Sequence, residues 1–441
     1  MIDYAFLYSN FYLKYLKKEL WEKYTFLLKS QNYTREELDA YVNKKIKRLV
    51  KHVEYNVPFY RDYMKRNKIS HHDINTADDL KEYFPVIDKE IIIKNYEDFI
   101  SDTIGKIKVK KSATSGSSGK QLFFYKSLES VDWSWAVIYR YYSWFGVRFG
   151  DKQVALWGRF DETEKKNFRK IVSAFIHRKI KMSAYKMTDE QLMQYAMFIK
   201  KYSPALLRGY ASALYNMAVF LEKNNISING LKGISSTSDM LTENMRNYIQ
   251  DVFNTKVYNQ YACGEIQGGA MECEEQNGLH IAEEHNIYEV DSGEEEEGNI
   301  IITDLDNYAM PFIRYKNGDR GIITSAPCTC GRSSKRLLKI VGRSEEFVVL
   351  PDGRRLNTTF FSPFFSHYSF IKQFQIVQEN MNEIVVNLVS SGAYDEHQKL
   401  KEDFYSYLGK EIKIYFEFVD KITLSKSGKY PVIINKTLSN A

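Results

Sequence analysis

The sequence predicts an α/β protein, with a large N-terminal domain of mixed, largely parallel sheets flanked by helices and a small C-terminal α+β domain. Its 441 residues are too many for one hydrophobic core and too few for three. Strand-like apolar segments alternate with helical patterns, as in sheets whose parallel strands are joined by helices; they lie at 154–157, 205–210, 233–239 and 256–261. Strands and helices alternate again beyond residue 343, so we expect domains at 1–343 and 344–441.

The composition is that of a globular chain and argues against several classes of protein. Hydrophobic residues make up 44% and charged residues 27%, which excludes a disordered chain. The net charge of +6 is spread along the length, which argues against a nucleic-acid-binding arm. No segment approaches the roughly 18 consecutive apolar residues of a membrane helix, and the N-terminus lacks the basic-then-apolar order of a signal peptide. We therefore expect a cytoplasmic protein without a nucleic-acid partner or a membrane span; its oligomeric state is not indicated.

Helical periodicity marks three parts of the N-terminal region. Residues 1–75 are rich in Tyr, Leu and Lys with interspersed acidic residues, which favours amphipathic helices with solvated lysines over a membrane-surface role. A further helix is expected to start at Asp88. Residues 130–149 place tryptophans and tyrosines at helical spacing. Aromatic residues in this pattern are most often core, and they also suit the wall of a pocket for a flat substrate.

A loop of small and hydroxylated residues joins two strand-like segments, at 106–110 and 122–125. Its glycines tolerate positive φ, and it presents hydroxyls, backbone N–H groups and one ammonium to the same point, as a polyphosphate site requires. The residues expected to bind the phosphates are Thr114, Ser115, Gly116, Ser117, Ser118, Gly119 and Lys120. A flexible turn is the alternative. A Walker A loop does not fit, because Thr114 and Gln121 stand where that motif needs a glycine and a hydroxyl residue.

This loop resembles the Thr-Ser-Gly-Ser-Thr-Gly-x-Pro-Lys loop of adenylate-forming enzymes. Its shorter form, with Lys120 directly after Gly119, resembles the phenylacetate–CoA ligase-like and capsule-biosynthesis (CapK-type) branch. Four later segments resemble motifs of the same superfamily in the same order: Tyr-Ala-Cys-Gly-Glu at 261–265, Arg-Tyr-Lys-Asn-Gly-Asp at 314–319, Gly-Arg-Ser-Glu at 342–345 and Ser-Lys-Ser-Gly-Lys at 425–429. Each alone is equally well explained by an exposed turn or a solvated charge, but five in register are not.

The resemblance implies an ATP-dependent ligase that forms an acyl-adenylate and releases pyrophosphate. It implies that Tyr261 stacks on adenine, that Glu265 holds Mg²⁺, and that Asp319 accepts hydrogen bonds from the ribose hydroxyls. Glu265 also follows a strand that ends in a loop, where ligands collect in α/β sheets. The motif departs from the family's Tyr-Gly-x-Thr-Glu at Ala262 and Gly264, which leaves open what contacts the α-phosphate.

The resemblance also implies that Arg343 lies near the ribose, that Glu345 is the hinge of a mobile small domain, and that Lys429 bridges the carboxylate and the α-phosphate. Attack of a carboxylate on ATP brings two anions together, so cations must neutralise both. The expected catalytic residues are Lys429, Lys120 and Glu265. No proton-transferring base is needed, which fits the absence of a Gly-x-Ser-x-Gly elbow.

The four cysteines all lie between residues 263 and 330, too few and too clustered for a disulfide framework. Cys273, His280, Cys328 and Cys330 offer three thiolates and an imidazole, a tetrahedral set suited to structural zinc. Cys263 is an alternative fourth ligand, and buried free cysteines are the alternative to a metal site. A similar Cys-x-Cys-Gly-Arg recurs in the phenylacetate–CoA ligase-like branch, some members of which bind zinc.

The sequence leaves open which acid is activated and which acceptor receives it. CoA, a carrier-protein thiol and an amine are the expected acceptors. The acid pocket is expected between the aromatics of 130–144, the Arg208-Gly209-Tyr210 turn and the loop near Cys263. The aromatics favour an apolar or aryl acid. A non-catalytic or scaffolding relative of the same fold is the main alternative, and a phosphate-loop kinase or NTPase is the other.

Overall fold

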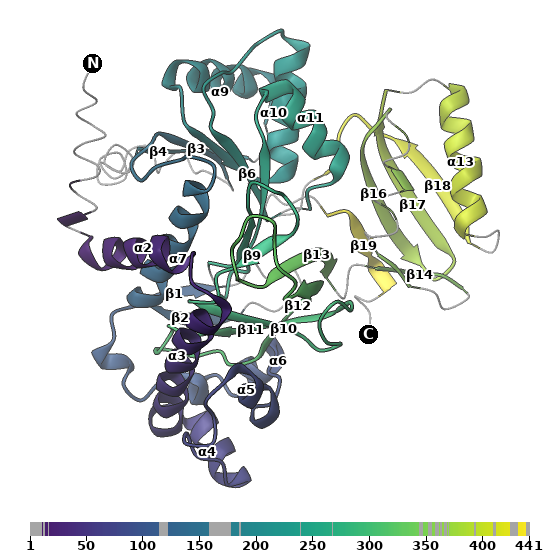
Figure 1. Ribbon diagram of the computed structural model, residues 1–441. Helices are drawn as coiled ribbons and strands as arrows, with labels where there is room; N and C mark the ends of the chain where they lie inside the picture. Colours follow the sequence, from purple (N-terminus) through teal and green to yellow (C-terminus); the bar gives the residue numbers. More distant parts are fainter. Residues whose placement is uncertain are drawn as a thin grey trace.

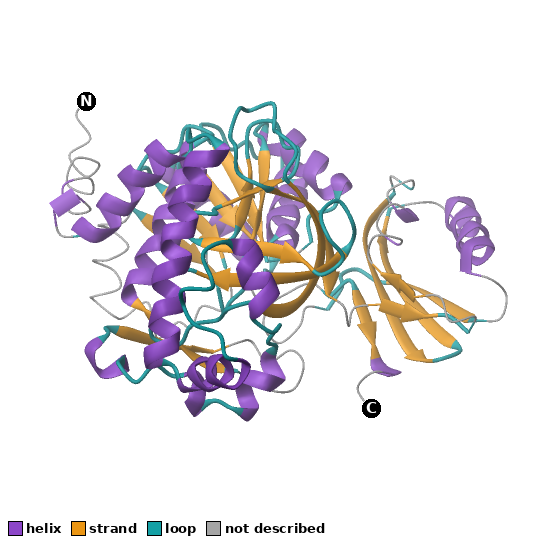
Figure 2. Ribbon diagram, turned by 60° about the horizontal axis from the view of Figure 1, so that its bottom comes forward, coloured by secondary structure: helices purple, strands orange, loops and turns teal. Residues whose placement is uncertain are grey.

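The computed structural model describes residues 11, 14–15, 17–113, 122–157, 178–184, 187–238, 240–266, 268–343, 347–351, 355–357, 361, 364–365, 368, 370–391, 394–408, 412–423 and 431–437. One large sheet organises the main body, and a smaller sheet near the C-terminus stands beside it (Figures 1 and 2). The predicted fold class is confirmed: a mixed α/β body flanked by helices with a smaller C-terminal sheet unit. The boundary at 343/344 stays a prediction.

The large sheet has eleven strands in the order β10-β11-β12-β13-β9-β8-β7-β6-β5-β3-β4. Its parallel half contains β7 (Val257–Tyr261), β6 (Gly233–Thr237), β5 (Leu206–Gly209), β3 (Gln153–Leu156) and β4 (Lys179–Met182). Its antiparallel half contains β10 (Asn286–Val290), β11 (Gly298–Asp304), β12 (Tyr315–Thr324), β13 (Arg336–Arg343), β9 (Leu279–Ile281) and β8 (Ala270–Glu272). Among the strands of this sheet, parallel pairing is confined to the half in which α-helices join β4 to β5, β5 to β6 and β6 to β7.

Helices cover both faces of the parallel half. On one face, α9 (Asp189–Tyr202), α10 (Ala211–Lys223) and α11 (Glu243–Phe253) form a core with Val154 and Leu156 of β3. On the other face, α2 (Lys18–Ser30) packs against α7 (Leu128–Ser143), the aromatic helix expected from the sequence. Because side chains alternate along a strand, residues next to Val154 in β3 point toward α7.

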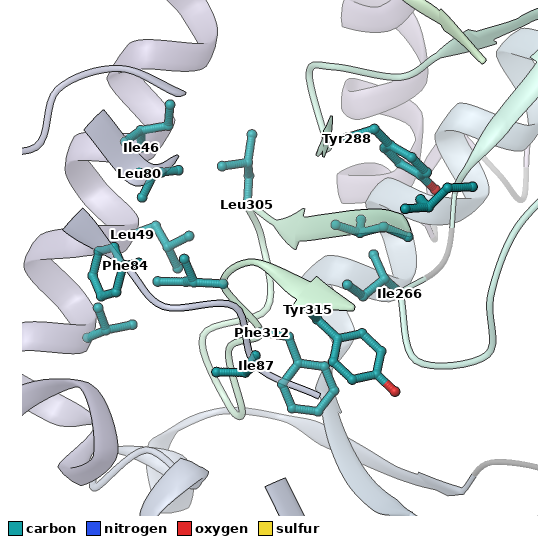
Figure 3. Packing of buried hydrophobic residues seen from close by; sticks show 14 of the residues in the cluster. Ile46, Leu49, Leu80, Phe84, Ile87, Ile266, Tyr288, Leu305, Phe312 and Tyr315 are labelled. Atoms are coloured by element: carbon teal, nitrogen blue, oxygen red, sulfur yellow. The ribbon is translucent and has the colours of Figure 1, made fainter. Parts of the chain in front are cut away.

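The N-terminal helices bury one face against the antiparallel half. They are α3 (Arg35–Asn56), α4 (Pro58–Asn67), α5 (Ala77–Tyr83) and α6 (Lys89–Lys94), with short 3₁₀ turns at Glu97–Phe99 and Ile104–Lys106. Thr34, Thr76 and Asp88 cap three of them with side-chain oxygens. Figure 3 shows Ile46, Leu49, Leu80 and Phe84 facing Leu305, Phe312 and Tyr315. No helix in the described ranges is both long enough and apolar enough to span a bilayer.

An antiparallel hairpin formed by β1 (Val109–Ala113) and β2 (Phe123–Ser127) carries the Ser/Gly loop. Two strands flank the loop as predicted, and Ala113 pairs with Phe123 at the open end of the ladder. The first strand begins at Val109, three residues later than predicted, because Ile104–Lys106 forms a 3₁₀ turn. Residues 114–121 lie outside the described residues. Ser127 then caps α7, so the loop and the aromatic helix are separated only by β2.

The C-terminal sheet has the order β18-β17-β16-β19 and its own hydrophobic core. Its strands are β18 (Lys413–Phe418), β17 (Glu383–Ser390), β16 (Ile371–Asn380) and β19 (Ile433–Asn435), and helix α13 (Tyr394–Leu408) accompanies them. A small hairpin of β14 (Phe347–Val349) and β15 (Arg355–Asn357) lies between this unit and the large sheet in sequence.

Candidate functional site

Three residues predicted to meet the nucleotide converge at the carboxyl end of β7. Tyr261 is the last residue of β7 and donates a hydrogen bond from its hydroxyl to Oδ2 of Asp319 in β12, at 2.7 Å. Glu265 follows four residues later and accepts a hydrogen bond from the Tyr315 hydroxyl at 3.0 Å. The structure therefore brings two of the proposed motifs, 261–265 and 314–319, to one place.

Asn317 completes the polar contacts around this pair. Its side-chain amide donates to the Tyr261 hydroxyl at 2.7 Å and to Oδ2 of Asp319 at 3.1 Å, and its Oδ1 accepts from the Asp319 N–H at 3.0 Å. Burial and the Asp319 charge raise the pKa of Tyr261 well above its usual value. Tyr261 is therefore a neutral donor to a half-buried carboxylate at physiological pH.

The backbone around Tyr261 is packed closely. Gly269 adopts φ +62°, and a Cβ at that position would lie 1.9 Å from the Tyr261 carbonyl oxygen. Only glycine allows this approach of two backbone segments. On the neighbouring strand, Asp319 pairs with Arg343 in the β12–β13 ladder, which places the backbones of these two predicted ribose-site residues side by side.

Arg314 has a different environment from the residues that follow it in its motif. Its buried guanidinium pairs with Glu289 at 2.7 Å and donates to the carbonyl oxygens of Lys81 and Phe84. These contacts join the N-terminal helices to the large sheet. Arg314 thus has a structural role, whereas Tyr315 reaches Glu265.

Lys126 was not singled out by the sequence, yet it lies at the same centre. Only 3% of Lys126 is exposed. Its ammonium donates to the Gly264 carbonyl oxygen at 2.7 Å. Burial lowers its pKa to about 8, although Cys263, Asp304 and Glu265 act in the opposite direction. The only clue in the sequence was a lysine at the end of the apolar strand that follows the Ser/Gly loop.

Several predicted residues lie outside the described residues. They are Thr114, Ser115, Gly116, Ser117, Ser118, Gly119, Lys120, Glu345 and Lys429. Their roles stay predictions, as does the role of the Arg343 side chain.

The structure brings the four predicted zinc ligands together. Cys273 follows β8, His280 lies in β9, and Cys328 and Cys330 lie in the turn between β12 and β13. Their ligand atoms lie within 4.8 Å of one another. The sulfurs of Cys273 and Cys328 are 3.9 Å apart, and the sulfur of Cys330 is 3.3 Å from Nε2 of His280. Tetrahedral zinc with Zn–S bonds of about 2.3 Å requires sulfur–sulfur distances of about 3.8 Å.

The protonation chemistry of this group also suits a metal. Burial and the charges of Arg332, Arg336 and Arg140 lower the pKa of His280 to about 3, so its imidazole is neutral. Nδ1 of His280 is 2.8 Å from the Ser334 hydroxyl, which orients the ring and leaves Nε2 toward the thiols. Burial and the neighbouring cysteines raise the pKa of Cys273 to about 12. A cation among the sulfurs would stabilise their thiolate forms.

Cys263, the alternative fourth ligand, is not part of this group. Its thiol donates to the Ile266 carbonyl oxygen at 3.4 Å, and its pKa is raised to about 12 by burial and by Glu265. A neutral buried thiol of this kind is unreactive.

A second buried group, His285, Asp304 and Asp306, has the residue types of a metal site. The ammonium of Lys45, however, is 2.6 Å from Oδ2 of Asp306 and lies 4.1 Å from the centre of the Trp133 ring. Nδ1 of His285 contacts the same carboxylate at 2.7 Å. The cation that this group needs is thus already supplied by the chain.

Comparison with known proteins agrees with the geometry. The CapK C-terminal domain family matches residues 348–436. Protein CapK of Staphylococcus aureus is 27% identical over 418 residues, which cover 89% of this chain and 88% of that protein. A phenylacetate–coenzyme A ligase of Thermus thermophilus is 26% identical over 328 residues and 72% of each chain. The chain is therefore similar to the phenylacetate–CoA ligases and to CapK, and its residues 348–436 match the CapK C-terminal domain.

The fold of the chain is also that of a solved ligase. A crystal structure of 2-hydroxyisobutyryl-CoA ligase in the postadenylation state superposes with a TM-score of 0.75 at 17% sequence identity, and covers 93% of this chain and 92% of that one. Both sheets of the chain therefore belong to one known fold. The Tyr261–Asp319 contact lies in its large sheet, outside the matched CapK C-terminal domain.

Proposed function

We propose that this protein is an ATP-dependent ligase that activates a carboxylic acid as an acyl-adenylate, releases pyrophosphate and transfers the acyl group to an acceptor. The observation that carries the proposal is the convergence of Tyr261, Glu265 and Asp319 at the end of β7. Homology to phenylacetate–CoA ligases and the fold of CoA ligases support adenylate-forming chemistry. The acceptor is CoA, a carrier-protein thiol or an amine, in polysaccharide or secondary-metabolite biosynthesis.

The residues present suit an ATP site with Mg²⁺. Glu265 is the carboxylate that would hold the ion, and Tyr315 orients it by one hydrogen bond. Bound Mg²⁺ would neutralise charge on the phosphates. Lys126 holds the Gly264 carbonyl, and so fixes the loop that presents Glu265. Lys120 and Lys429 are proposed to neutralise the leaving pyrophosphate and the α-phosphate.

The proposal includes two domains that meet just after β13. Arg343 ends this strand beside Asp319, so a hinge at Glu345 would lie two residues from the predicted ribose site. Rotation there would move Lys429 away from the nucleotide after adenylation and admit the acceptor. The CapK C-terminal domain match at 348–436 supports a separate C-terminal unit.

We also propose that Cys273, His280, Cys328 and Cys330 bind one structural Zn²⁺. Four protein ligands leave no open position for water, so the ion would join β8, β9 and the β12–β13 turn and take no part in the reaction.

The alternative is a non-catalytic relative that keeps the fold. Ala262 and Gly264 replace residues of the family's Tyr-Gly-x-Thr-Glu motif, and this observation favours it. The test is pyrophosphate release from ATP across aryl, fatty and amino acids, each with and without CoA. Release that depends on one acid supports the ligase, and a further dependence on CoA identifies the acceptor. ATP binding without release for any acid would favour the non-catalytic alternative.

A further inference from the structure

Two cations on the α7-facing side of the large sheet have no anionic partner among the residues that the structure describes. Lys179 is the first residue of β4, and Arg208 is the third residue of β5. Both are half-buried. The Nε atom of Arg208 is buried and has no hydrogen-bond partner. Among the described residues, no carboxylate lies within ion-pair distance of either side chain.

The register of the sheet places these cations around one small residue. β3 lies between β4 and β5, and Ala155 of β3 pairs with Lys181 on one side and with Arg208 on the other. Lys179 pairs with Gln153, two residues earlier on the same face. Ala155 keeps part of its surface exposed although it lies on an interior strand. The methyl side chain thus leaves space between the cations.

Aromatic rings of α7 form the opposite wall. The Lys179 ammonium lies 4.3 Å from the centre of the Trp135 ring and 4.4 Å from that of Tyr139. The guanidinium of Arg208 lies 4.6 Å from the Trp157 ring centre. Ring faces attract cations but leave their hydrogen-bond donors free. Trp157 directly follows β3, so its ring belongs to the sheet side and not to α7. We call this group of Lys179, Arg208, Trp135, Tyr139 and Trp157 the cationic cluster.

Keeping two partly buried cations close together without an anion is unfavourable in free energy, and a bound anion would offset this. Burial and the charges of Arg208 and Lys181 lower the pKa of Lys179 to about 7. Buried cations are normally paired, because desolvation disfavours a lone charge. Proteins keep such unfavourable groups where binding requires them.

The cationic cluster lies where the sequence places the acid site, between the aromatic residues of α7 and the 208–210 turn. Lys126, which contacts the Gly264 carbonyl oxygen, precedes the cap of this helix by one residue. Trp135 lies on the third turn, and from Ser127 the helix rises about 12 Å to reach it. An acid whose carboxylate reacts beside Gly264 would have to span a comparable distance to place a second group at the cationic cluster.

We propose that the activated acid carries a second anionic group, a carboxylate or a phosphate, which Lys179 and Arg208 bind at the far end of the acid site. This inference rests on the proposed function and names the substrate class of that same site. It replaces the apolar or aryl acid that the aromatic residues favoured. The rings hold the two cations in place, and the cations select an acid with a second negative charge.

The test compares matched acids that differ only in the terminal charge. Pyrophosphate release is measured with adipate, suberate and sebacate against hexanoate, octanoate and decanoate. We expect kcat/KM for at least one dicarboxylate to exceed that of its monocarboxylate by tenfold or more. Lys179→Met and Arg208→Met should each reduce this ratio at least tenfold, mainly through KM of the acid. Lys179→Arg should retain the preference, and Lys200→Met, at an exposed lysine of α9, is the control.

Three results would overturn the inference. The first is an equal or better reaction with monocarboxylates at every chain length. The second is a dianion preference that survives both Met substitutions. The third is a pair of variants that change KM of CoA and not KM of the acid.

Thermal unfolding at constant ionic strength separates this inference from the proposed function. Suppose that no acid supports pyrophosphate release. A rise in melting temperature with suberate but not with octanoate, which Lys179→Met and Arg208→Met abolish, would still support the anion site. The same result would count against the ligase on this panel of acids. No charge-dependent rise would overturn the anion site, even in a protein that proves to be a ligase.

Discussion

The hydroxyl of Tyr261 and the carboxylate of Asp319 lie 2.7 Å apart, at the end of β7 and within β12. This contact joins the parallel and antiparallel halves of the large sheet, because β8, β9 and β13 separate these two strands in the strand order. The polar site therefore depends on how the two halves curve toward each other. A carboxylate held in this way is preorganised to accept further hydrogen bonds from a ligand.

Asp319→Asn should weaken ATP binding while the fold is retained. The amide cannot accept two charge-assisted hydrogen bonds, each worth about 1.5–3 kcal/mol, so we expect the Kd for ATP to rise about 10- to 100-fold. Tyr261→Phe keeps the ring and removes only the hydroxyl, and should raise the Kd less than about fivefold. Isothermal titration with ATP and Mg²⁺ measures both. A larger effect of Tyr261→Phe than of Asp319→Asn would contradict the assignment of Asp319 to the ribose.

The purified protein should contain one zinc ion per chain, as measured by elemental analysis. Cys328→Ser should lose the zinc and lower the melting temperature, because the proposed ion would join three segments of the large sheet. Cys263→Ser is the matched control, since this thiol lies outside the four-residue group and donates to the Ile266 carbonyl. A metal-free protein with full stability, or zinc loss in Cys263→Ser, would refute the four-ligand site.

Lys126→Met should lower kcat/KM about 10- to 100-fold, equivalent to about 1.4–2.8 kcal/mol, by freeing the loop that carries Glu265. The melting temperature should stay equal or rise, because burial already disfavours the charged ammonium. Lys110→Met is the matched control: Lys110 is paired with Lys126 across the β1–β2 ladder but is exposed. Equal losses of stability and activity would assign Lys126 to packing alone.

Lys429→Ala should abolish pyrophosphate release and leave ATP binding within about threefold of the original protein. The lysine is proposed to act on the α-phosphate during attack, so its loss removes a contact made mainly in the transition state. ATP titration and pyrophosphate release measured on the same preparation separate the two effects. Unaltered adenylation would remove the proposed role of this residue.

The sequence predicted the elements that local patterns specify, and not those that depend on pairing across the sheet. The aromatic helix, the parallel strands and the hairpin around the Ser/Gly loop follow from periodicity and glycine placement. The four cysteine and histidine ligands could be grouped because thiolates and imidazole share one preferred ion. Strands β8, β9 and β10 are three to five residues long and gain their stability from neighbours, so no local pattern marks them.

The same limit applies to single residues. Arg314 stood in a nucleotide motif, but its guanidinium pairs with Glu289 far along the chain. Lys126 and Lys179 resembled ordinary strand lysines until register placed them beside Gly264 and Arg208. The function of a charged residue depends on which charged and polar groups lie near it in the folded chain, and the sequence alone does not show these neighbours.

Lys179 predicts a distinctive pH dependence of stability. Its pKa is about 7 in the folded chain and near the model-peptide value of 10.5 when unfolded. Between these values the unfolded chain binds the proton and the folded chain does not, so the unliganded protein should gain stability as pH rises from about 7 to 10. The groups that face Lys179 in the described structure are Arg208, Lys181 and the Tyr139 phenol, whose pKa burial raises, so the phenol stays neutral in this window.

Lys179→Met should therefore stabilise the unliganded protein at pH 6 and remove this part of the pH dependence. Each pKa unit corresponds to about 1.4 kcal/mol, and partial exposure reduces the effect, so we expect the free energy of unfolding to rise by about 1–3 kcal/mol. Binding of a dianionic acid requires the protonated lysine, so the KM of that acid should rise as pH increases through about 7 in the original protein and lose this dependence in Lys179→Met. Denaturant unfolding at pH 6 and 9 and KM at the same pH values measure both effects. A substitution that lowers stability at pH 6 would show that Lys179 serves the fold, and one that raises stability while it weakens binding of the acid assigns the lysine to the substrate.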